Sequence, residues 1–217
     1  TLTADRMDLV GSLQATGGAA QLNTATAGWG VDLGSATDVA ANALELSDAE
    51  LDRITAAGLL VVSSRADLTL SSAISPSGVA SLSLLAEGAL LDGNASGADV
   101  TVATLAMDAT SVGAFGNRLE TAASNLSARA RAGGVYVIDS DGLTLSSASS
   151  TGAGTFVTAQ GPLTVTGNVT ASGNQIDLAA LGSGSMLRVG AGAAVSGSSV
   201  TLTADRMDLV GSLQATG

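Results

Sequence analysis

The first seventeen residues of the chain, TLTADRMDLVGSLQATG, return unchanged at its other end as residues 201–217. A shared fold alone does not preserve every surface residue, so this identity indicates a recent tandem duplication with a period of 200 residues. The simplest interpretation is that residues 1–200 form one repeat unit and residues 201–217 open the next identical unit. The two copies are then expected to superpose, related by a translation of roughly 50 Å along a common axis with some twist.

The composition favours a thin, layered core over an ordinary globular one. Of the 217 residues, 46% are hydrophobic but only 2% are aromatic, whereas globular cores of this size rely on aromatic rings to fill their volume. Small and aliphatic residues must therefore supply the core. Because only 12% of the residues are charged, the chain is expected to fold and not to be disordered.

The charge balance and the missing residue types exclude several functions. The chain carries 19 acidic and 8 basic residues, so it lacks the basic surface that nucleic acid and anionic lipid require. It has no Cys and no His, which removes disulfides, the usual zinc sites and the commonest general base. No apolar run approaches the ~20 residues of a membrane-spanning helix. We therefore expect no nucleic-acid partner and no membrane span.

Short alternating segments separated by small residues predict an all-β fold. Each segment is too short for a typical helix, and most show a period of two. Few Asn-Gly or Asp-Gly hairpin dipeptides connect them, and small-residue turns such as GSGS and SGSS stand between them instead. This pattern is typical of a parallel β-helix, or β-solenoid, with about 20 residues per coil and on the order of 10 coils. The expected strands include Ala66–Leu70, Val79–Leu84, Asp99–Ala103, Val135–Ile138, Leu143–Leu145, Thr155–Val157, Pro162–Thr166, Gln175–Leu178, Met186–Val189 and Val200–Thr203.

One segment departs from the β pattern. Ser47 and Glu50 have the spacing of a capping box, and Gly58 is a natural stop, so a short helix is predicted over Ser47–Ala57 at a corner of the solenoid. A second segment, Arg118–Ala130, has apolar residues that could line one helical face, but its Ser and Asn content favours strand-turn-strand instead.

Several phrases of the sequence resemble units of very large filamentous haemagglutinin-like exoproteins. They are LSDAELDRITAAGLLVV (Leu46–Val62) and NRLETAASNLSARA (Asn117–Ala130), with ISPSGVASLSLLAEGALLDGN and VTVATLAMDA between them. The recognisable part extends from about Val31 to Leu145. The resemblance implies a right-handed parallel β-helix that is exported by a two-partner or related route, displayed at a bacterial surface and used in adhesion or matrix building.

Two groups of acidic residues are candidates for chemistry. Asp139 and Asp141 present alternating carboxylates in a turn and could hold Ca²⁺, although a solvated turn explains them better. Asp67, Asp99 and Asp177 lie in strand-like segments where stacked coils could pair them for glycoside hydrolysis, which needs two carboxylates about 5 to 9.5 Å apart. Outward-facing, solubilising acids explain these three better, because the chain offers few aromatics to stack a sugar ring.

The favoured functional hypothesis is a structural segment of a tandemly repeated extracellular fibre or adhesin, without catalysis, at the bacterial cell surface. Its expected partners are neighbouring units of the same chain, with lateral fibre contacts or surface glycans as further candidates, and no cofactor is expected apart from Ca²⁺. The alternative is a carbohydrate-binding or polysaccharide-degrading β-helix. An acid-lined groove with aromatic platforms would favour this alternative, and a smooth surface rich in Gly, Ser and Thr would count against it.

Overall fold

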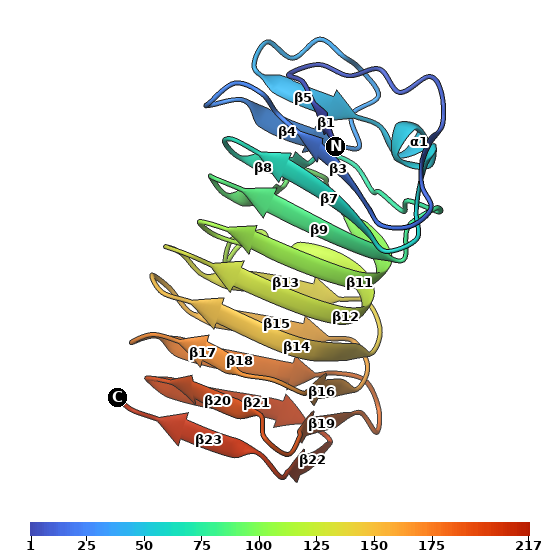
Figure 1. The fold of residues 1–217 in the computed structure, drawn as a ribbon. Helices are drawn as coiled ribbons and strands as arrows, with labels where there is room; N and C mark the ends of the chain where they lie inside the picture. Colours follow the sequence, from blue (N-terminus) through green and yellow to red (C-terminus); the bar gives the residue numbers. More distant parts are fainter.

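The chain is a right-handed parallel β-helix of about 10 turns with about 21 residues per turn (Figure 1), so the predicted fold class is confirmed. The computed structural model describes residues 1–217. Neighbouring strands pair in parallel along the whole stack. The two chain ends lie at opposite ends of the solenoid, which leaves each end coil without a neighbour on one side.

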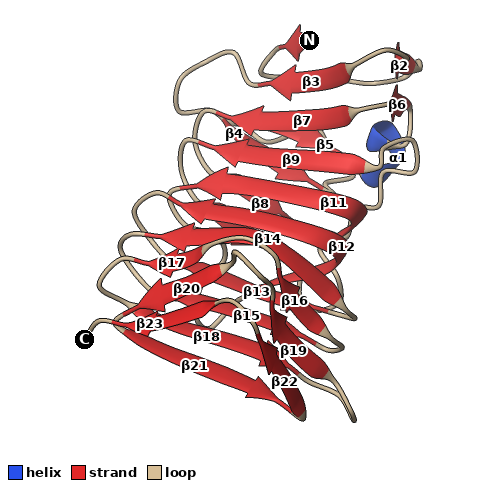
Figure 2. Cartoon of the chain, turned by 60° about the horizontal axis from the view of Figure 1, so that its bottom comes forward, coloured by secondary structure: helices blue, strands red, loops and turns tan.

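The strands line three sides of the solenoid, which we call the first, second and third faces in the order in which the chain visits them (Figure 2). The first face carries β1 (Leu2–Thr3), β3 (Ala19–Asn23), β7 (Leu59–Ser64), β9 (Ser81–Ala86), β17 (Val169–Ala171), β20 (Ala194–Gly197) and β23 (Ser212–Ala215). The second carries β4 (Gly30–Leu33), β5 (Ala43–Leu46), β8 (Leu68–Leu70), β10 (Leu90–Asp92), β13 (Val135–Asp139), β15 (Thr155–Ala159), β18 (Gln175–Ala180) and β21 (Ser199–Ala204). The third carries β2 (Leu13–Ala15), β6 (Ile54–Ala56), β16 (Leu163–Val165), β19 (Met186–Val189) and β22 (Arg206–Leu209). Three longer strands bend around a corner onto the first face: β11 (Val100–Ala109), β12 (Leu119–Ala130) and β14 (Leu143–Ser150).

The core consists of aliphatic ladders that run parallel to the solenoid axis. Alternate residues of each strand point inward, and parallel register places like residues above one another from coil to coil. The resulting core is one continuous cluster of 48 buried residues. The clearest ladder, which we call the leucine ladder, is Leu60, Leu82, Leu105, Leu126, Leu145, Val165, Val189 and Leu209.

The predicted short helix exists but is only one turn long. Ser47 caps α1 (Asp48–Leu51): its hydroxyl accepts from the Glu50 N–H, and the Glu50 carboxylate accepts from the Ser47 N–H, which completes the capping box. The prediction that the helix reaches Ala57 is wrong. Ile54–Ala56 forms β6 because Ile54 and Ala56 are buried and the strand pairs with β2, so tertiary pairing overrides local helix propensity. No helix of the structure is long enough to cross a membrane.

The N-terminal coils contain a detour that the sequence pattern did not predict. After β4 the chain turns back toward the N-terminal end and adds β5 above β4 on the second face before it enters α1. The Glu45 carboxylate holds the intervening loop by accepting from the Ala40 N–H and from the Ser35 and Thr37 hydroxyls. Farther along, β12 is one long strand that pairs with β11 and β14, so both the helical alternative for Arg118–Ala130 and the turn expected within it are wrong.

The two copies of the seventeen-residue repeat each form one coil, and each coil bends at Asp5 and Gly11 or at their counterparts Asp205 and Gly211. They do not occupy the same faces. The first copy has β1 on the first face and β2 on the third, whereas the second copy has β21 on the second face and β23 on the first. The predicted close superposition is therefore not seen: the copies lie one face apart, and Arg206–Leu209 forms β22 whereas residues 6–9 form no strand. A period of 200 residues is thus a whole number of turns plus one face. The cause is variable coil length: paired positions are 20 residues apart at Leu187 and Met207 but 24 apart at Leu163 and Leu187.

Candidate functional site

The first repeat copy is fixed to the coil below it by a dense set of contacts. Leu2 pairs with Leu22, and Leu13 pairs with Ile54, so both strands of the copy have a parallel neighbour. The main-chain N–H and C=O of Leu9 bond to the side chains of Glu50 and Arg53. The inward side chains of this copy, including Met7, Leu9 and Leu13, pack on the core.

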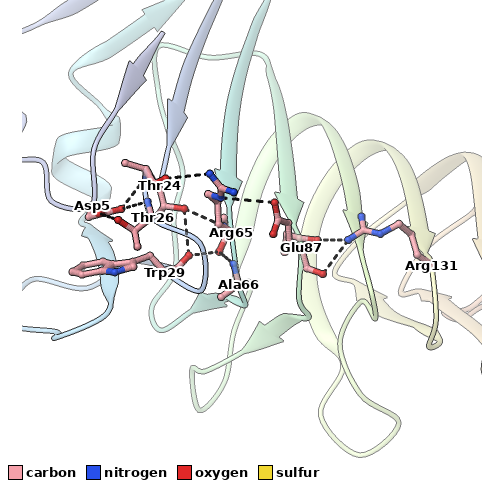
Figure 3. A network of polar contacts seen from close by, with 11 residues as sticks. Asp5, Thr24, Thr26, Trp29, Arg65, Ala66, Glu87 and Arg131 are labelled. Carbon is pink, nitrogen blue, oxygen red and sulfur yellow. Dashed lines mark hydrogen bonds and ion pairs between the residues drawn. The ribbon is translucent and has the colours of Figure 1, made fainter.

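Asp5 anchors the same coil at the corner between the first and second faces (Figure 3). Its carboxylate accepts from the Thr26 hydroxyl at 2.5 Å and from the N–H groups of Ala25 and Thr26, both at 2.8 Å. These bonds, the Thr26 hydroxyl first, lower the pKa of Asp5 below its usual 3.8. The polar network continues down the corner, since Arg65 donates to the Ala25 carbonyl and pairs with Glu87.

The second repeat copy contacts the coil above it and has no coil below. Arg206 donates to the Gly184 carbonyl, and Asp208 pairs with Arg188 at 3.2 Å. Beneath it the solenoid is open, and the inward side chains Met207, Leu209 and Leu213 are 45%, 45% and 42% exposed. The same sequence therefore has a coil only below it at one end of the chain and only above it at the other.

A second candidate site is an aromatic cluster on the outer surface of the second face. Phe115, Tyr136 and Phe156 are three of the four aromatic residues of the chain. Tyr136 and Phe156 stack with ring centroids 5.3 Å apart, and Phe115 meets both rings edge-on. The Arg118 guanidinium lies 6.0 Å from the Phe115 centroid and 5.7 Å from that of Phe156, so it adds cation–π contacts.

Glycines make room for this cluster. A Cβ at Gly134 would lie 2.6 Å from the Tyr136 ring, and a Cβ at Gly154 would lie 2.6 Å from the Phe156 ring. The rings therefore lie close over the backbone, and only Phe115, at 65% exposure, projects far into solvent. Beside them is a groove of about 450 Å³ whose polar lining is Asn174, Gln175, Ser198 and Ser199, without a carboxylate.

A third candidate is an acidic cluster at the end of β10, formed by Asp92, Asp99 and Glu120. Carboxylate oxygens of the three residues lie within 4.8 Å of one another, close enough to share a hard divalent cation such as Ca²⁺. Asp99 is fully buried, and it accepts from the Asn94 side-chain amide and the Glu120 N–H. Burial, together with the nearby Asp92 and Glu120 charges, raises the pKa of Asp99 to about 7.

The acidic residues singled out from the sequence fall in different places. Asp139 is buried, where it accepts from the Thr121 hydroxyl and the Ala123 N–H, while Asp141 is exposed. Burial raises the pKa of Asp139. This placement supports a structural turn for DSDG. Asp99 joins Asp92 and Glu120, and neither Asp67 nor Asp177 belongs to that group.

The sequence analysis did not predict the aromatic cluster, and it named only Asp99 of the acidic cluster, although a signal for both clusters exists. Phe115, Tyr136 and Phe156 follow one another at intervals of 21 and 20 residues, and Asp99 and Glu120 are 21 apart. These intervals equal one coil of about 21 residues. Like residues repeated at the coil length stack on the same face of a solenoid, so this spacing could have indicated both clusters.

Comparison of the chain with models of protein families, with curated proteins and with solved structures finds no match.

Proposed function

We propose that this chain is a structural repeat segment of a long extracellular fibre or adhesin at a bacterial cell surface, without catalysis. The observation that carries the proposal is the repeated coil: residues 201–217 stack on β18–β20 as one further coil of the solenoid and present an open end. A β-solenoid extends by adding coils, because each coil contacts only its neighbours.

The surface and the sequence support the same proposal. With a net charge of −11, neighbouring fibres repel one another unless divalent cations bridge them. Open sheet edges at the end of an isolated unit are an aggregation hazard, which an array confines to its two termini. The resemblance of Leu46–Val62 and Asn117–Ala130 to filamentous haemagglutinin-like exoproteins supports export and surface display.

A two-unit chain tests the proposal. We expect the full chain extended by a second copy of its own residues 18–217 to form one straight rod of about twice the length of the 217-residue chain, because stacked strands add about 4.8 Å per coil. Small-angle scattering gives the length, and electron microscopy shows whether the rod is continuous. Two separate bodies joined by a flexible segment would contradict the proposal.

Carbohydrate binding is a second candidate function, which the aromatic groove favours. Sugar rings stack on exposed aromatic faces, and the amides of Asn174 and Gln175 supply donors and acceptors for hydroxyl groups. Because the groove lining contains no carboxylate, it lacks the acid pair of a glycoside hydrolase. The groove therefore suits binding of a neutral glycan better than its cleavage.

We expect Phe115→Ala to abolish saturation-transfer NMR signals from neutral oligosaccharides that contact the wild-type chain, because it removes the exposed ring of the groove. Val39→Ala is the matched control, since Val39 is 79% exposed and is not part of the groove lining. Equal signals from wild type and Phe115→Ala, or none from wild type across a neutral glycan panel, would count against this second function.

A further inference from the structure

We infer that the underside of the second repeat copy, residues 201–217, is the docking surface for residues 18–57 of a following identical unit, in the register that the first copy already adopts. The inference rests on the proposed function and adds the register, the contacting residues and the rotation between units. Its template lies within this chain, because residues 1–17 have the same sequence and are seen seated on residues 18–57.

Each copy has one neighbouring coil, and the two copies lack opposite ones: the first has a coil only below it and the second only above it. Met7, Leu9 and Leu13 pack against the core, whereas their counterparts Met207, Leu209 and Leu213 are nearly half exposed. Leu209 is also the uncovered end of the leucine ladder, directly below the buried Val189. A following coil would cover this end as Val189 is covered now, so the site is incomplete without the next unit.

The aspartate of the repeat can serve both neighbours at once. In the second copy the Asp205 carboxylate accepts from the Gly184 N–H above it. In the first copy the equivalent Asp5 carboxylate accepts from Ala25 and Thr26 below it. A carboxylate has about four acceptor positions, which is enough for all of these donors. The arginine differs, because Arg6 donates to the Asp38 and Ala40 carbonyls of the following residues whereas Arg206 donates to the Gly184 carbonyl of the preceding coil. Its guanidinium must divide its donors between the two neighbours when both are present.

The register also sets the rotation of the array. The first copy begins on the first face, and the second copy begins on the second face. Each unit is then turned by one face, about a third of a turn, relative to the unit before it. The aromatic groove of successive units would consequently face three directions around the fibre and return to the first after three units.

Disulfide trapping in the two-unit chain tests the register. Because the chain has no natural cysteine, only the introduced thiols can form a disulfide. In the first copy Thr3 lies directly opposite Asn23, with the Asn23 amide donating to the Thr3 hydroxyl. We expect Thr203→Cys to form a disulfide with a cysteine placed at the second unit's counterpart of Asn23, since opposed residues on adjacent strands lie within disulfide range. The pair Thr3→Cys with Asn23→Cys is the positive control.

A cysteine at the second unit's counterpart of Gln21 is the out-of-register control. Gln21 points to the same outer surface as Asn23 but lies two residues earlier on β3. Preferential crosslinking of Thr203→Cys to this position, or to neither position while the positive control oxidises, would overturn the inferred register. If this happens in a continuous rod of double length, the proposed function survives and only the inference fails.

Amide hydrogen exchange gives an independent readout without cysteines. In the first copy the N–H of Ala4 donates to Asn23, and the N–H of Leu13 donates to Arg53. We expect the equivalent amides of Ala204 and Leu213 to exchange rapidly in the 217-residue chain and to become at least as protected as those of Ala4 and Leu13 in the two-unit chain. Unchanged exchange at both amides would overturn the inference.

Discussion

Replacing Leu126 by alanine is expected to destabilise the solenoid by about 2–5 kcal/mol, the usual range for a fully buried leucine. Leu126 is fully buried in the middle of the leucine ladder, between Leu105 and Leu145. The truncation leaves a cavity that cannot collapse easily, because the parallel strands above and below hold the neighbouring leucines at a fixed spacing of about 4.8 Å. The midpoint of urea unfolding, followed by circular dichroism, measures the effect.

Leu209→Ala provides a matched control, because it is the same substitution at the open end of the same ladder. Leu209 is 45% exposed, so its truncation removes less buried surface than that of Leu126. The space left by Leu209→Ala is open to solvent, whereas Leu126→Ala leaves an enclosed cavity. We expect a loss below about 1 kcal/mol. Equal losses at the two positions would contradict a continuous ladder with an uncovered end. Unfolding should be checked with more than one probe, since repeat solenoids can depart from two-state behaviour.

The fold class could be predicted because the solenoid repeats a simple local pattern. Every alternating segment named from the sequence, from Ala66–Leu70 to Val200–Thr203, overlaps a strand of the structure. A period of two determines which side chains point inward, and the scarcity of Asn-Gly and Asp-Gly dipeptides disfavours tight hairpins between consecutive strands. Parallel stacking then follows, since the strands have no antiparallel partner in reach.

The pairing of individual strands could not be predicted in the same way, because the lengths of the coils and of their turns vary. The detour into β5 and the early end of α1 both depend on pairing with distant strands, β4 for the first and β2 for the second. A local pattern contains no information on such partners. The shift of one face between the repeat copies is the accumulated result of these variable turns, so the duplication was evident from the sequence but its geometry was not.

The candidate sites depend even more on stacking. Asp99 and Glu120 come together because Val100 pairs with Thr121, one coil later. Tyr136 and Phe156 stack because the two residues are directly paired. Once the coil length is known, the spacing explains both clusters. It does not explain the contribution of Asp92, which comes from the end of a strand.

Asp99→Asn is expected to stabilise the protein at pH 8 and to have little stabilising effect at pH 4. The pKa of Asp99 is raised from 3.8 to about 7, first by burial and then by the charges of Asp92 and Glu120. At a pH between 3.8 and about 7, Asp99 keeps its proton in the folded chain but has released it in the unfolded chain. By linkage, stability therefore falls as pH rises through this window, and the whole penalty is present above about pH 7.

The asparagine avoids this penalty because it stays neutral at every pH and keeps an acceptor for the Glu120 N–H. Its NH2 group would stand where Asp99 Oδ1 now accepts from the Asn94 amide, so a flip of the Asn94 amide, which brings its unpartnered Oδ1 to that position, keeps this hydrogen bond. We expect a gain on the order of 1–3 kcal/mol at pH 8, measured by urea unfolding in EDTA so that no divalent cation neutralises the cluster. Asp177→Asn is the control, since it changes the net charge equally at an outward position of β18 whose carboxylate has no hydrogen bond. If both variants gained equally, relief of the general negative charge would explain the result. A gain confined to Asp99→Asn, disappearing toward pH 4, would identify the buried carboxylate as the group that weakens this solenoid at neutral pH.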